Sequence, residues 1–295
     1  PPGSIQTANA GGPADGWVGV FSTASGALAP QFASYHGGSN YDQVYFVQTD
    51  EDGLVYGFGQ GRNGLPIIGD VYANEGSGQF ITCWSPDLSE ILWQTTIGTE
   101  NGSIDISPTA FLVSDCQQIY ISGWGGQSND IGGESTVDGS TTYGLPTTSD
   151  AFQSSTDGSD FYLAVLAPGA EDLVYGTFLG GGFSSEHVDG GSSRFDINGT
   201  VYQAVCAGCG SFDDFPSTPG AWSSVNPSFN CNMGVFKFEL GTLNASIDLE
   251  GPDAFCTGEE VQFVNNTGGA VAFVWDFGDA TYSEEIAPSH LYGIE

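Results

Sequence analysis

One short proline-containing loop occurs three times in this chain, in related forms. The copies read GLPIIGDVY (64–72), GLPTTSDAF (144–152) and DFPSTPGAW (214–222). A loop that returns at long intervals indicates a repeated structural unit, and a unit of this kind constrains the fold more than any single residue does. The chain should therefore be divisible into segments of one architecture.

Short strands at fixed places around each loop define this unit. The strand before each loop contains a tyrosine, which is Tyr56, Tyr120 or Tyr202. Another strand precedes it, a third follows the loop, and a fourth follows in the first two copies. The N-terminal stretch supplies a third and a fourth strand, DGWVGVFS (15–22) and ALAPQFASYHGG (27–38). Because Gly, Asp, Asn and Ser clusters separate these segments, the sequence predicts an all-β protein.

Four short strands joined by tight turns form a sheet that cannot be stable alone, since it has two exposed edges and two faces to cover. Radial repetition of four-stranded sheets, as blades of a β-propeller, solves this problem. A stacked array of sandwiches and a β-solenoid are the alternatives. Pro216 lacks an N–H and suits a loop. The aromatic residue, or the Ala-Phe or Ala-Trp pair, that ends each loop is expected to pack against its blade.

The order of these motifs resembles the β-propeller repeat abbreviated SBBP. GGxxxD, DxxGxVYxxG, FPxTPGAxx and GxFVxxF follow one another as in that family, over residues 1–242. The insertion at 125–143 and the first loop depart from the pattern. The resemblance implies about three and a half blades, fewer than a closed propeller needs, with further blades expected before Pro1 or from another chain.

The last segment, 243–295, resembles the N-terminal part of a PKD domain, which is an Ig-like β-sandwich. EVQFVNNT (260–267) and AFVWDFGD (272–279) are its expected strands. The resemblance implies that the tryptophan of the motif is a core residue and that Gly-Asp forms a turn, so that none of these residues is catalytic. The shared motif consists of Trp275, Asp276, Phe277, Gly278, Asp279, His290 and Tyr292.

Acidic residues outnumber basic ones by 36 to 3, which gives a formal net charge of -33. Nucleic acid is excluded as a partner, because phosphate contacts need Lys and Arg. Direct membrane insertion is not expected, since the chain has no apolar run of membrane-spanning length. Self-repulsion of this size is tolerated where counter-ions are abundant, so the charge indicates an extracellular setting or, alternatively, a surface that is simply soluble.

Three of the six cysteines lie close together in the third unit. Cys206 and Cys209 end its second strand, and Cys231 precedes its third strand. A disulfide from Cys206 or Cys209 to Cys231 would close the 210–230 loop. A zinc site on the C-x-x-C pair is the alternative, but it lacks a histidine nearby in sequence. Cys83, Cys116 and Cys256 receive no assigned partner.

A calcium site is predicted in the insertion of the second unit, whose segment QSNDIGGESTVDG (127–139) is rich in oxygen ligands and glycine. Hard cations prefer several oxygen ligands on a loop that can wrap around them. A solvated acidic loop is the simpler alternative. Calcium is the only cofactor that the sequence suggests. The candidate ligands are Asn129, Asp130, Glu134 and Asp138.

Catalysis is not expected. The three histidines are far apart in the sequence, and no Ser-His-Asp, Cys-His or His-x-x-x-His spacing is present.

The family resemblances imply a large secreted surface protein of Bacteroidetes, a cargo of type IX secretion that acts in adhesion or gliding. Its partners would be surface glycans, surface proteins or copies of itself. A structural subunit of an extracellular filament or sheath is the first alternative. An accessory binding region of a secreted hydrolase is the second.

Overall fold

A computed structural model of the chain describes residues 4–24, 26–126, 140–188, 193–240, 247–251, 255, 258–265, 267 and 273–293. The chain divides into two compact units, Pro1–Leu240 and Gly241–Glu295. Apart from the single-turn 3-10 helix η1 (Pro168–Ala170), the elements described are all strands. None of the described residues forms a helix of sufficient length and apolarity to cross a membrane. The chain is therefore all-β, as the sequence predicts.

The larger unit consists of small antiparallel sheets that follow one another in chain order. The first sheet contains β1 (Gly16–Ser22) and β2 (Ala29–His36). The second contains β3 (Asp42–Thr49), β4 (Val55–Gly61), β5 (Gln79–Trp84) and β6 (Ile91–Ile97). The third contains β7 (Ser107–Val113), β8 (Ile119–Trp124), β9 (Phe161–Leu166) and β10 (Leu173–Leu179). The fourth contains β11 (Ser185–His187), β12 (Arg194–Phe195), β13 (Thr200–Cys209) and β14 (Asn232–Glu239).

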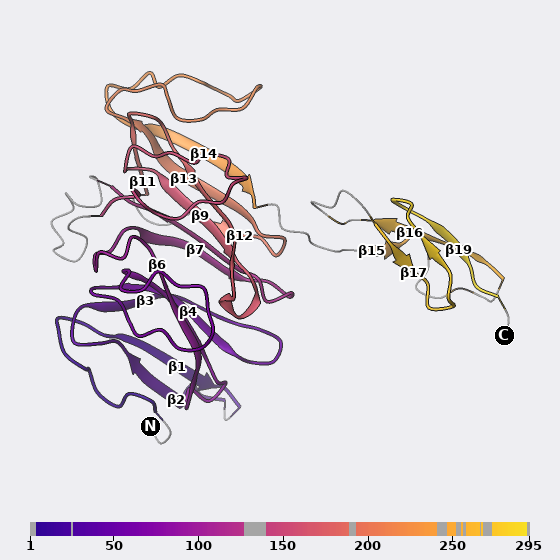
Figure 1. Cartoon of the computed structure of the whole chain (residues 1–295), viewed down its shortest axis with the longest axis horizontal. Helices are drawn as coiled ribbons and strands as arrows, with labels where there is room; N and C mark the ends of the chain where they lie inside the picture. Colours follow the sequence, from indigo (N-terminus) through magenta and orange to yellow (C-terminus); the bar gives the residue numbers. More distant parts are fainter. Residues whose placement is uncertain are drawn as a thin grey trace. The chain divides into compact units, whose positions relative to one another are not determined.

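The sheets are stacked one on another, from β1 and β2 in indigo to β14 in orange (Figure 1). The predicted four-stranded antiparallel unit is confirmed, because the second and third sheets pair their strands in the orders β3-β4-β5-β6 and β7-β8-β9-β10. Tyr56, Tyr120 and Tyr202 lie in β4, β8 and β13, the second-strand position of three successive sheets. The described residues do not close the stack into a ring.

The first-strand position of the fourth sheet is divided between two short strands. β11 and β12 both pair with β13, at opposite ends of it, and β14 pairs with the other edge of β13. No described strand lies beyond β14 in this sheet. The first sheet holds only β1 and β2, which match the third and fourth strands of the repeat. The two ends of the stack are therefore less complete than its middle.

The core lies between successive sheets. Phe58 and Ile81 of the second sheet pack with Phe111 of the third, and the rings of Phe58 and Phe111 have centroids 5.7 Å apart. Leu163 of the third sheet belongs to the next cluster, with Val201 of the fourth. Because both of their faces are covered, β4, β5 and β9 are buried throughout. This explains why β9 is a continuous apolar run, FYLAVL, whereas β4 and β5 also bury the polar residues Gln60, Gln79 and Thr82.

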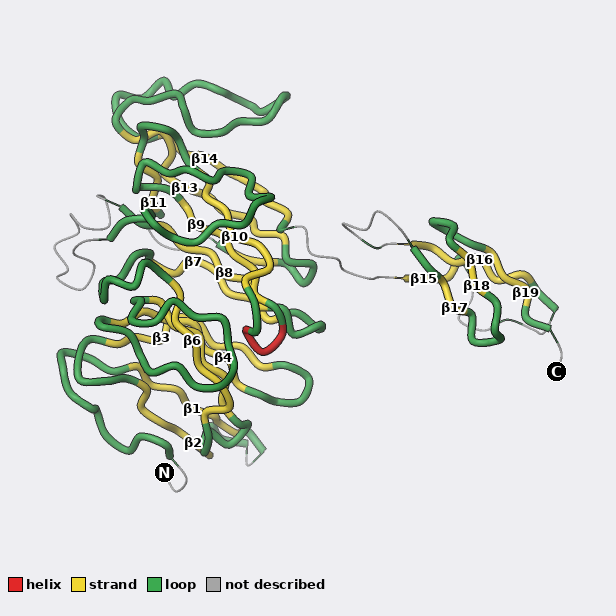
Figure 2. The backbone as a smooth tube through the Cα atoms, viewed as in Figure 1, coloured by secondary structure: helices red, strands yellow, loops and turns green. Residues whose placement is uncertain are grey.

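Long loops connect the strands at the ends of the sheets (Figure 2). The proline loop of the second sheet lies against the third, since the Tyr72 N–H donates a hydrogen bond to the Ala170 carbonyl (2.8 Å). The loop of the third sheet reaches the fourth in a similar way, with Phe152 against Phe238 at a centroid distance of 5.6 Å. These loops therefore join each sheet to the next one.

The smaller unit contains two small antiparallel sheets. One consists of β15 (Ile247–Leu249), β16 (Glu260–Asn265) and β19 (Ser289–Leu291). The other consists of β17 (Trp275–Asp276) and β18 (Tyr282–Ser283). The strand predicted at 260–267 corresponds to β16, whereas the one predicted at 272–279 is reduced to the two residues of β17. The described residues of this unit do not establish a complete sandwich.

Candidate functional site

A disulfide between Cys209 and Cys231 closes the loop of the fourth sheet. Cys209 is the last residue of β13, and Cys231 directly precedes β14. The sequence left Cys206 and Cys209 open as partners of Cys231, and the structure uses Cys209. The bond joins adjacent strands at the root of the 210–230 loop. A cross-link of this span stabilises the folded state by about 3 kcal/mol, chiefly by restricting the unfolded chain.

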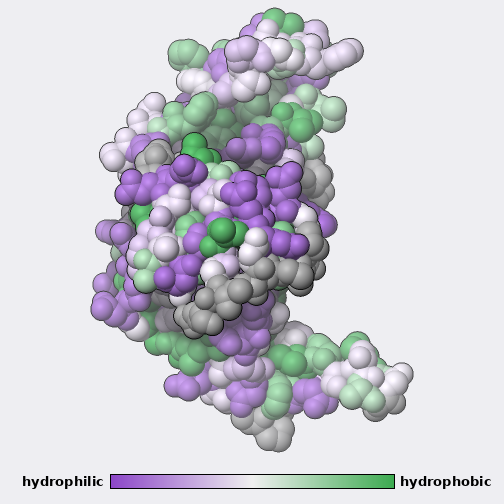
Figure 3. Space-filling view, turned by 90° about the vertical axis from the view of Figure 1, so that its right-hand side faces the viewer, coloured by the Kyte–Doolittle hydropathy of each residue, from purple (hydrophilic) through white to green (hydrophobic). Residues whose placement is uncertain are grey.

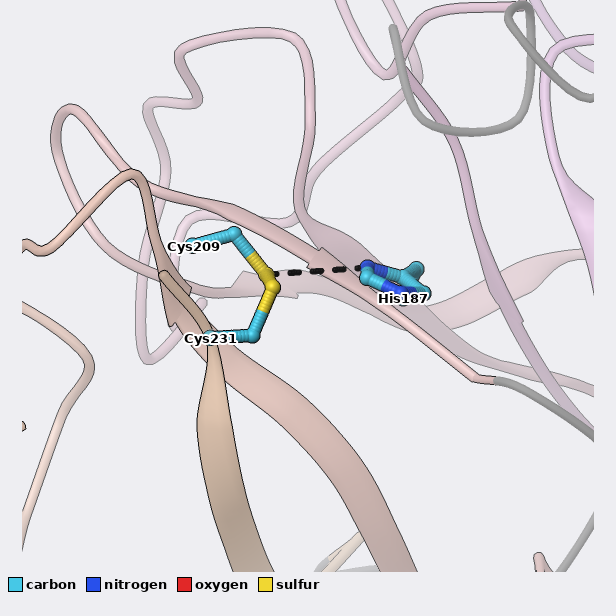
Figure 4. A group of neighbouring side chains, drawn as sticks. All are labelled: His187, Cys209 and Cys231. Atoms are coloured by element: carbon cyan, nitrogen blue, oxygen red, sulfur yellow. Dashed lines mark hydrogen bonds between the residues drawn. A yellow bond between two sulfur atoms is a disulfide. The ribbon is translucent and has the colours of Figure 1, made fainter. Parts of the chain in front are cut away.

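A histidine lies beside this disulfide. His187 ends β11, which pairs with β13 and places Ser185 opposite Cys209. The His187 Nδ1 atom lies 3.7 Å from Cys209 Sγ, and Figure 4 shows the imidazole ring directed at the sulfur pair. A ligand atom of His187 and the sulfurs of Cys209 and Cys231 all lie within 4.8 Å of one another.

The redox state decides what this group can bind. While the disulfide is formed, neither sulfur is a thiolate, and the group is a covalent cross-link beside an imidazole. Reduction would leave two thiols and a histidine, three ligands of the type that zinc prefers. The argument against zinc was that no histidine lies nearby in sequence. It does not hold in the structure, because His187 lies near both cysteines in space. No local sequence motif points to His187. The pairing of the first strand with the second strand in each repeat unit would have predicted its position beside Cys209.

The disulfide-closed loop carries an exposed apolar surface. Trp222 is fully exposed and Phe229 is 94% exposed. Next to the root of the loop, the rings of Phe183 and Phe212 have centroids 6.3 Å apart, and Phe183 is also largely exposed. Hydrophilic side chains cover most of the middle of the face in Figure 3, and hydrophobic ones appear towards its upper end, where this loop lies. The loop is thus a surface suited to contact with a partner.

The expectation that every loop aromatic packs against its blade is wrong for Trp222. Tyr72, at the matching position of the second sheet, is half-buried and contacts the core cluster. Trp222 has no such support, because no described sheet follows the fourth. A groove of about 90 Å³ lies under the loop and is lined by Phe212, Val225 and Met233, among others.

Each sheet from the second to the fourth begins beside a buried acidic residue. These residues are Asp42, Asp105 and Glu186, each at most 1% exposed. Their carboxylates accept backbone N–H groups from the preceding crossover, as from Gly38 to Asp42 (2.7 Å) and from Thr99 to Asp105 (2.9 Å). Burial raises the pKa of Asp42 and of Asp105 to about 6, and that of Glu186 to about 8. GGxxxD is the sequence signal for Asp42, and Glu186 follows a Gly-Gly pair at the same spacing, whereas no Gly-Gly pair precedes Asp105.

The predicted calcium ligands in the insertion, Asn129, Asp130, Glu134 and Asp138, lie outside the described residues. The predicted calcium site there stays a prediction.

The PKD-like motif forms an aromatic group in the smaller unit. His290 stacks on Phe277 with centroids 4.2 Å apart, and its Nε2 lies 2.8 Å from Asp279 Oδ2. The Trp275 indole N–H donates to the Glu285 carbonyl (2.8 Å). Gly278 has a φ of 81° and forms the turn between β17 and β18 with Asp279.

The remaining motif residues extend this group. Asp276 Oδ1 accepts the Gly278 N–H (2.9 Å), and Tyr292 lies edge-on to His290 at 4.5 Å. Trp275 is half-buried, so it is less enclosed than the core position that the resemblance implies. The hydroxyl of Thr281 and the imidazole of His290 lower the pKa of Asp279 to about 2. These contacts connect β17, the turn that follows it and β19.

Comparison with known proteins assigns no family to this chain. No protein-family model matches the sequence, and no curated protein matches it. The SBBP and PKD resemblances therefore depend on the sequence motifs alone.

Proposed function

We propose that the chain is a non-catalytic protein of the cell surface, which attaches to surface glycans or proteins through the 210–230 loop. In this proposal the stacked sheets are consecutive blades of a β-propeller of SBBP type, and the smaller unit is part of a PKD-like spacer. The resemblance further suggests export by type IX secretion. The observation that carries the proposal is that Trp222 and Phe229 are exposed on a loop whose root is closed by a disulfide.

Three physical properties support attachment through this loop at the cell surface. Exposed aromatic rings provide a large contact area and stack on the apolar faces of sugars or on partner side chains. The Cys209–Cys231 bond limits the freedom that the loop loses on binding. Disulfides of this kind persist in oxidising compartments, which agrees with an extracellular location.

Binding of the purified chain to an array of neutral and acidic polysaccharides tests the proposal. Trp222→Ala and Phe229→Ala should each weaken binding at least tenfold. Phe152→Ala is the matched control, because Phe152 is also an exposed aromatic residue of a proline loop but lies on the third sheet. Equal loss in all three variants, or binding that none of them alters, would assign attachment to another surface.

A structural subunit of an extracellular filament is a second candidate, because both ends of the sheet stack expose apolar side chains. Trp17 and Phe21 are exposed on β1, and Met233 and Val235 are exposed on β14. Association of one copy's β1–β2 face with another's β13–β14 face is a head-to-tail contact, which produces rings or open fibres. Negative-stain electron microscopy, first with calcium and then with a chelator, tests this candidate. Fibres would support it, and single particles in both conditions would contradict it.

A further inference from the structure

The imidazole of His187 and the two sulfurs of the loop disulfide form one compact group of metal-ligating side chains. Ligand atoms of His187, Cys209 and Cys231 all lie within 4.8 Å of one another, and no second group of three His, Cys, Asp or Glu side chains does so among the residues that the structure describes. His187 ends β11, Cys209 ends β13 and Cys231 directly precedes β14. The three side chains therefore come together at the root of the 210–230 loop (Figure 4).

Strand pairing and an aromatic contact fix the position of the histidine. His187 lies opposite Cys206 in the β11–β13 ladder. Its ring lies beside the indole of Trp124 in β8, with centroids 5.9 Å apart. Ligands that are carried by strands are placed more precisely than ligands that are carried by loops. The imidazole is therefore held beside the sulfurs by the sheet itself and not by the S–S bond.

The separation between the imidazole and the nearer sulfur matches that of a tetrahedral zinc site. Zinc binds thiolate sulfur at about 2.3 Å and imidazole nitrogen at about 2.0 to 2.1 Å. In a tetrahedron these bond lengths place the nitrogen about 3.6 Å from each sulfur and the two sulfurs about 3.8 Å from each other. The observed distance between His187 Nδ1 and Cys209 Sγ is 3.7 Å. The nitrogen thus already lies at the right distance, and only the sulfurs have to separate.

Cleavage of the S–S bond would let the sulfurs separate while the strands stay in place. Eight residue pairs join β13 to β14, and the last of them is Ala207 opposite Asn232. Cys209 and Cys231 lie just beyond this pair, so rotation about their Cα–Cβ bonds can move the sulfurs while the ladder holds the backbone. The reduced chain would therefore present two thiols and an imidazole to one ion.

The chemistry of these ligands selects the metal. Thiolate sulfur and neutral imidazole are ligands that zinc prefers, whereas calcium and magnesium prefer oxygen. Three protein ligands leave the fourth position of a tetrahedral zinc ion to water. The net charge of -33 also attracts divalent cations towards the chain. Zinc is therefore the ion that the reduced group fits best.

We propose that the reduced chain binds one zinc ion through His187, Cys209 and Cys231, and that formation of the disulfide releases it. The ion and the disulfide are then alternative closures of the same loop, because each joins the end of β13 to the start of β14. The loop that carries Trp222 and Phe229 would be closed before oxidation as well as after it. This site does not depend on what the loop attaches to, so failure of polysaccharide binding would leave the zinc proposal unaffected.

The exchange between the two closures balances in protons and electrons. Zinc binding displaces the proton of each thiol, and both protons leave to solvent. Oxidation then removes two electrons from the thiolates, forms the Cys209–Cys231 bond and releases zinc as Zn²⁺, with its charge unchanged. A disulfide-containing oxidant accepts the two electrons and, with two protons from solvent, becomes two thiols. A dithiol reductant would restore the zinc site by the reverse reaction.

The C-x-x-C pair is the competing ligand set for zinc. Cys206 lies opposite His187 in the ladder, but its sulfur is not part of the group within 4.8 Å. A site on this pair would use Cys206 and Cys209 and would need neither His187 nor Cys231. The two ligand sets therefore differ in which residues zinc binding requires.

Zinc titration of the chain tests the proposal, after anaerobic reduction with a phosphine and in competition with a chromophoric chelator. The reduced wild type should bind one zinc ion at this site, and the oxidised chain should not. His187→Ala and Cys231→Ser should each lower the zinc affinity at least tenfold. Cys206→Ser is the matched control and should leave the affinity unchanged. With Co²⁺ as a second probe, the thiolate-to-cobalt absorption of the reduced wild type should weaken in Cys231→Ser and persist in Cys206→Ser.

Alkylation of the zinc-loaded wild type, followed by mass spectrometry, identifies the ligands without any substitution. Zinc should slow the labelling of Cys209 and Cys231 but not that of Cys206. His187→Ala retains the disulfide, so thermal unfolding of its oxidised form shows whether this variant is folded. Protection of Cys206 and Cys209 with Cys231 left reactive would assign the ion to the C-x-x-C pair and overturn the proposal. Absence of zinc binding by the reduced wild type at micromolar zinc would also overturn it.

Discussion

The strand that follows the proline loop is β9 in the third sheet and β14 in the fourth, and the two have opposite surroundings. Every residue of β9 is buried, whereas β14 alternates between half-buried and exposed side chains. Their sequences differ accordingly, as FYLAVL (161–166) against NMGVFKFE (232–239). The position of a sheet in the stack, rather than the repeat itself, therefore determines the composition of its strands.

Truncation of one aliphatic side chain on each strand tests this contrast most strongly. Leu163→Ala should lower the free energy of unfolding by about 2 to 5 kcal/mol, because it leaves a cavity between two sheets. Val235→Ala, at a 71% exposed position, should change it by no more than about 0.5 kcal/mol. Urea unfolding of the purified chain measures both. A large loss in Val235→Ala would mean that something covers β14 in solution.

Removal of the disulfide should destabilise the end of the stack specifically. Cys231→Ser should lower the free energy of unfolding by about 3 kcal/mol, since the 210–230 loop becomes unrestricted. Cys116→Ser is the control, because Cys116 is exposed and forms no disulfide. Amide hydrogen exchange should rise in β13 and β14 and stay low in β8 and β9. A uniform rise would show that the stack unfolds as one cooperative unit.

Asp105, buried before the third sheet, should make the middle of the stack sensitive to pH. Burial raises its pKa to about 6, so between about pH 4 and 6 the folded chain holds a proton that the unfolded chain has lost. The free energy of unfolding should therefore decrease as the pH rises through this range, by about 2 kcal/mol from this group. Asp105→Asn should remove that part of the slope in chemical unfolding at several pH values. An unchanged slope would mean that Asp105 ionises normally.

The smallest effect on stability is expected at the loop tip. Trp222→Ala should alter the free energy of unfolding by less than about 0.5 kcal/mol, because the side chain is fully exposed. Tyr72→Ala, at the matching place in the second sheet, should cost more, since Tyr72 packs against the core. Thermal unfolding followed by circular dichroism compares the two. A clear loss of stability in Trp222→Ala would show that the loop folds back onto the sheets in solution.

The sequence predicts the repeat unit well, because strand alternation and turn residues are local signals. Tyr56, Tyr120 and Tyr202 were enough to align three sheets. The exposure of Trp222 was not predictable, since it depends on whether a further sheet follows the fourth. His187 was missed beside Cys209 for a related reason, because strand pairing brings together residues that are 22 positions apart.

The position of the disulfide has a mechanical consequence. The β13–β14 ladder begins with Ala207 opposite Asn232, next to the Cys209–Cys231 bond, and ends with Thr200 opposite Glu239, where the chain leaves the larger unit. A pulling force applied through residue 240 would load one hydrogen-bonded pair at a time, starting at the Glu239 end. The peeling strand would then meet the covalent bond and stop. Cys209–Cys231 thus prevents the 210–230 loop from adding length under tension, while the eight pairs of the ladder can reform.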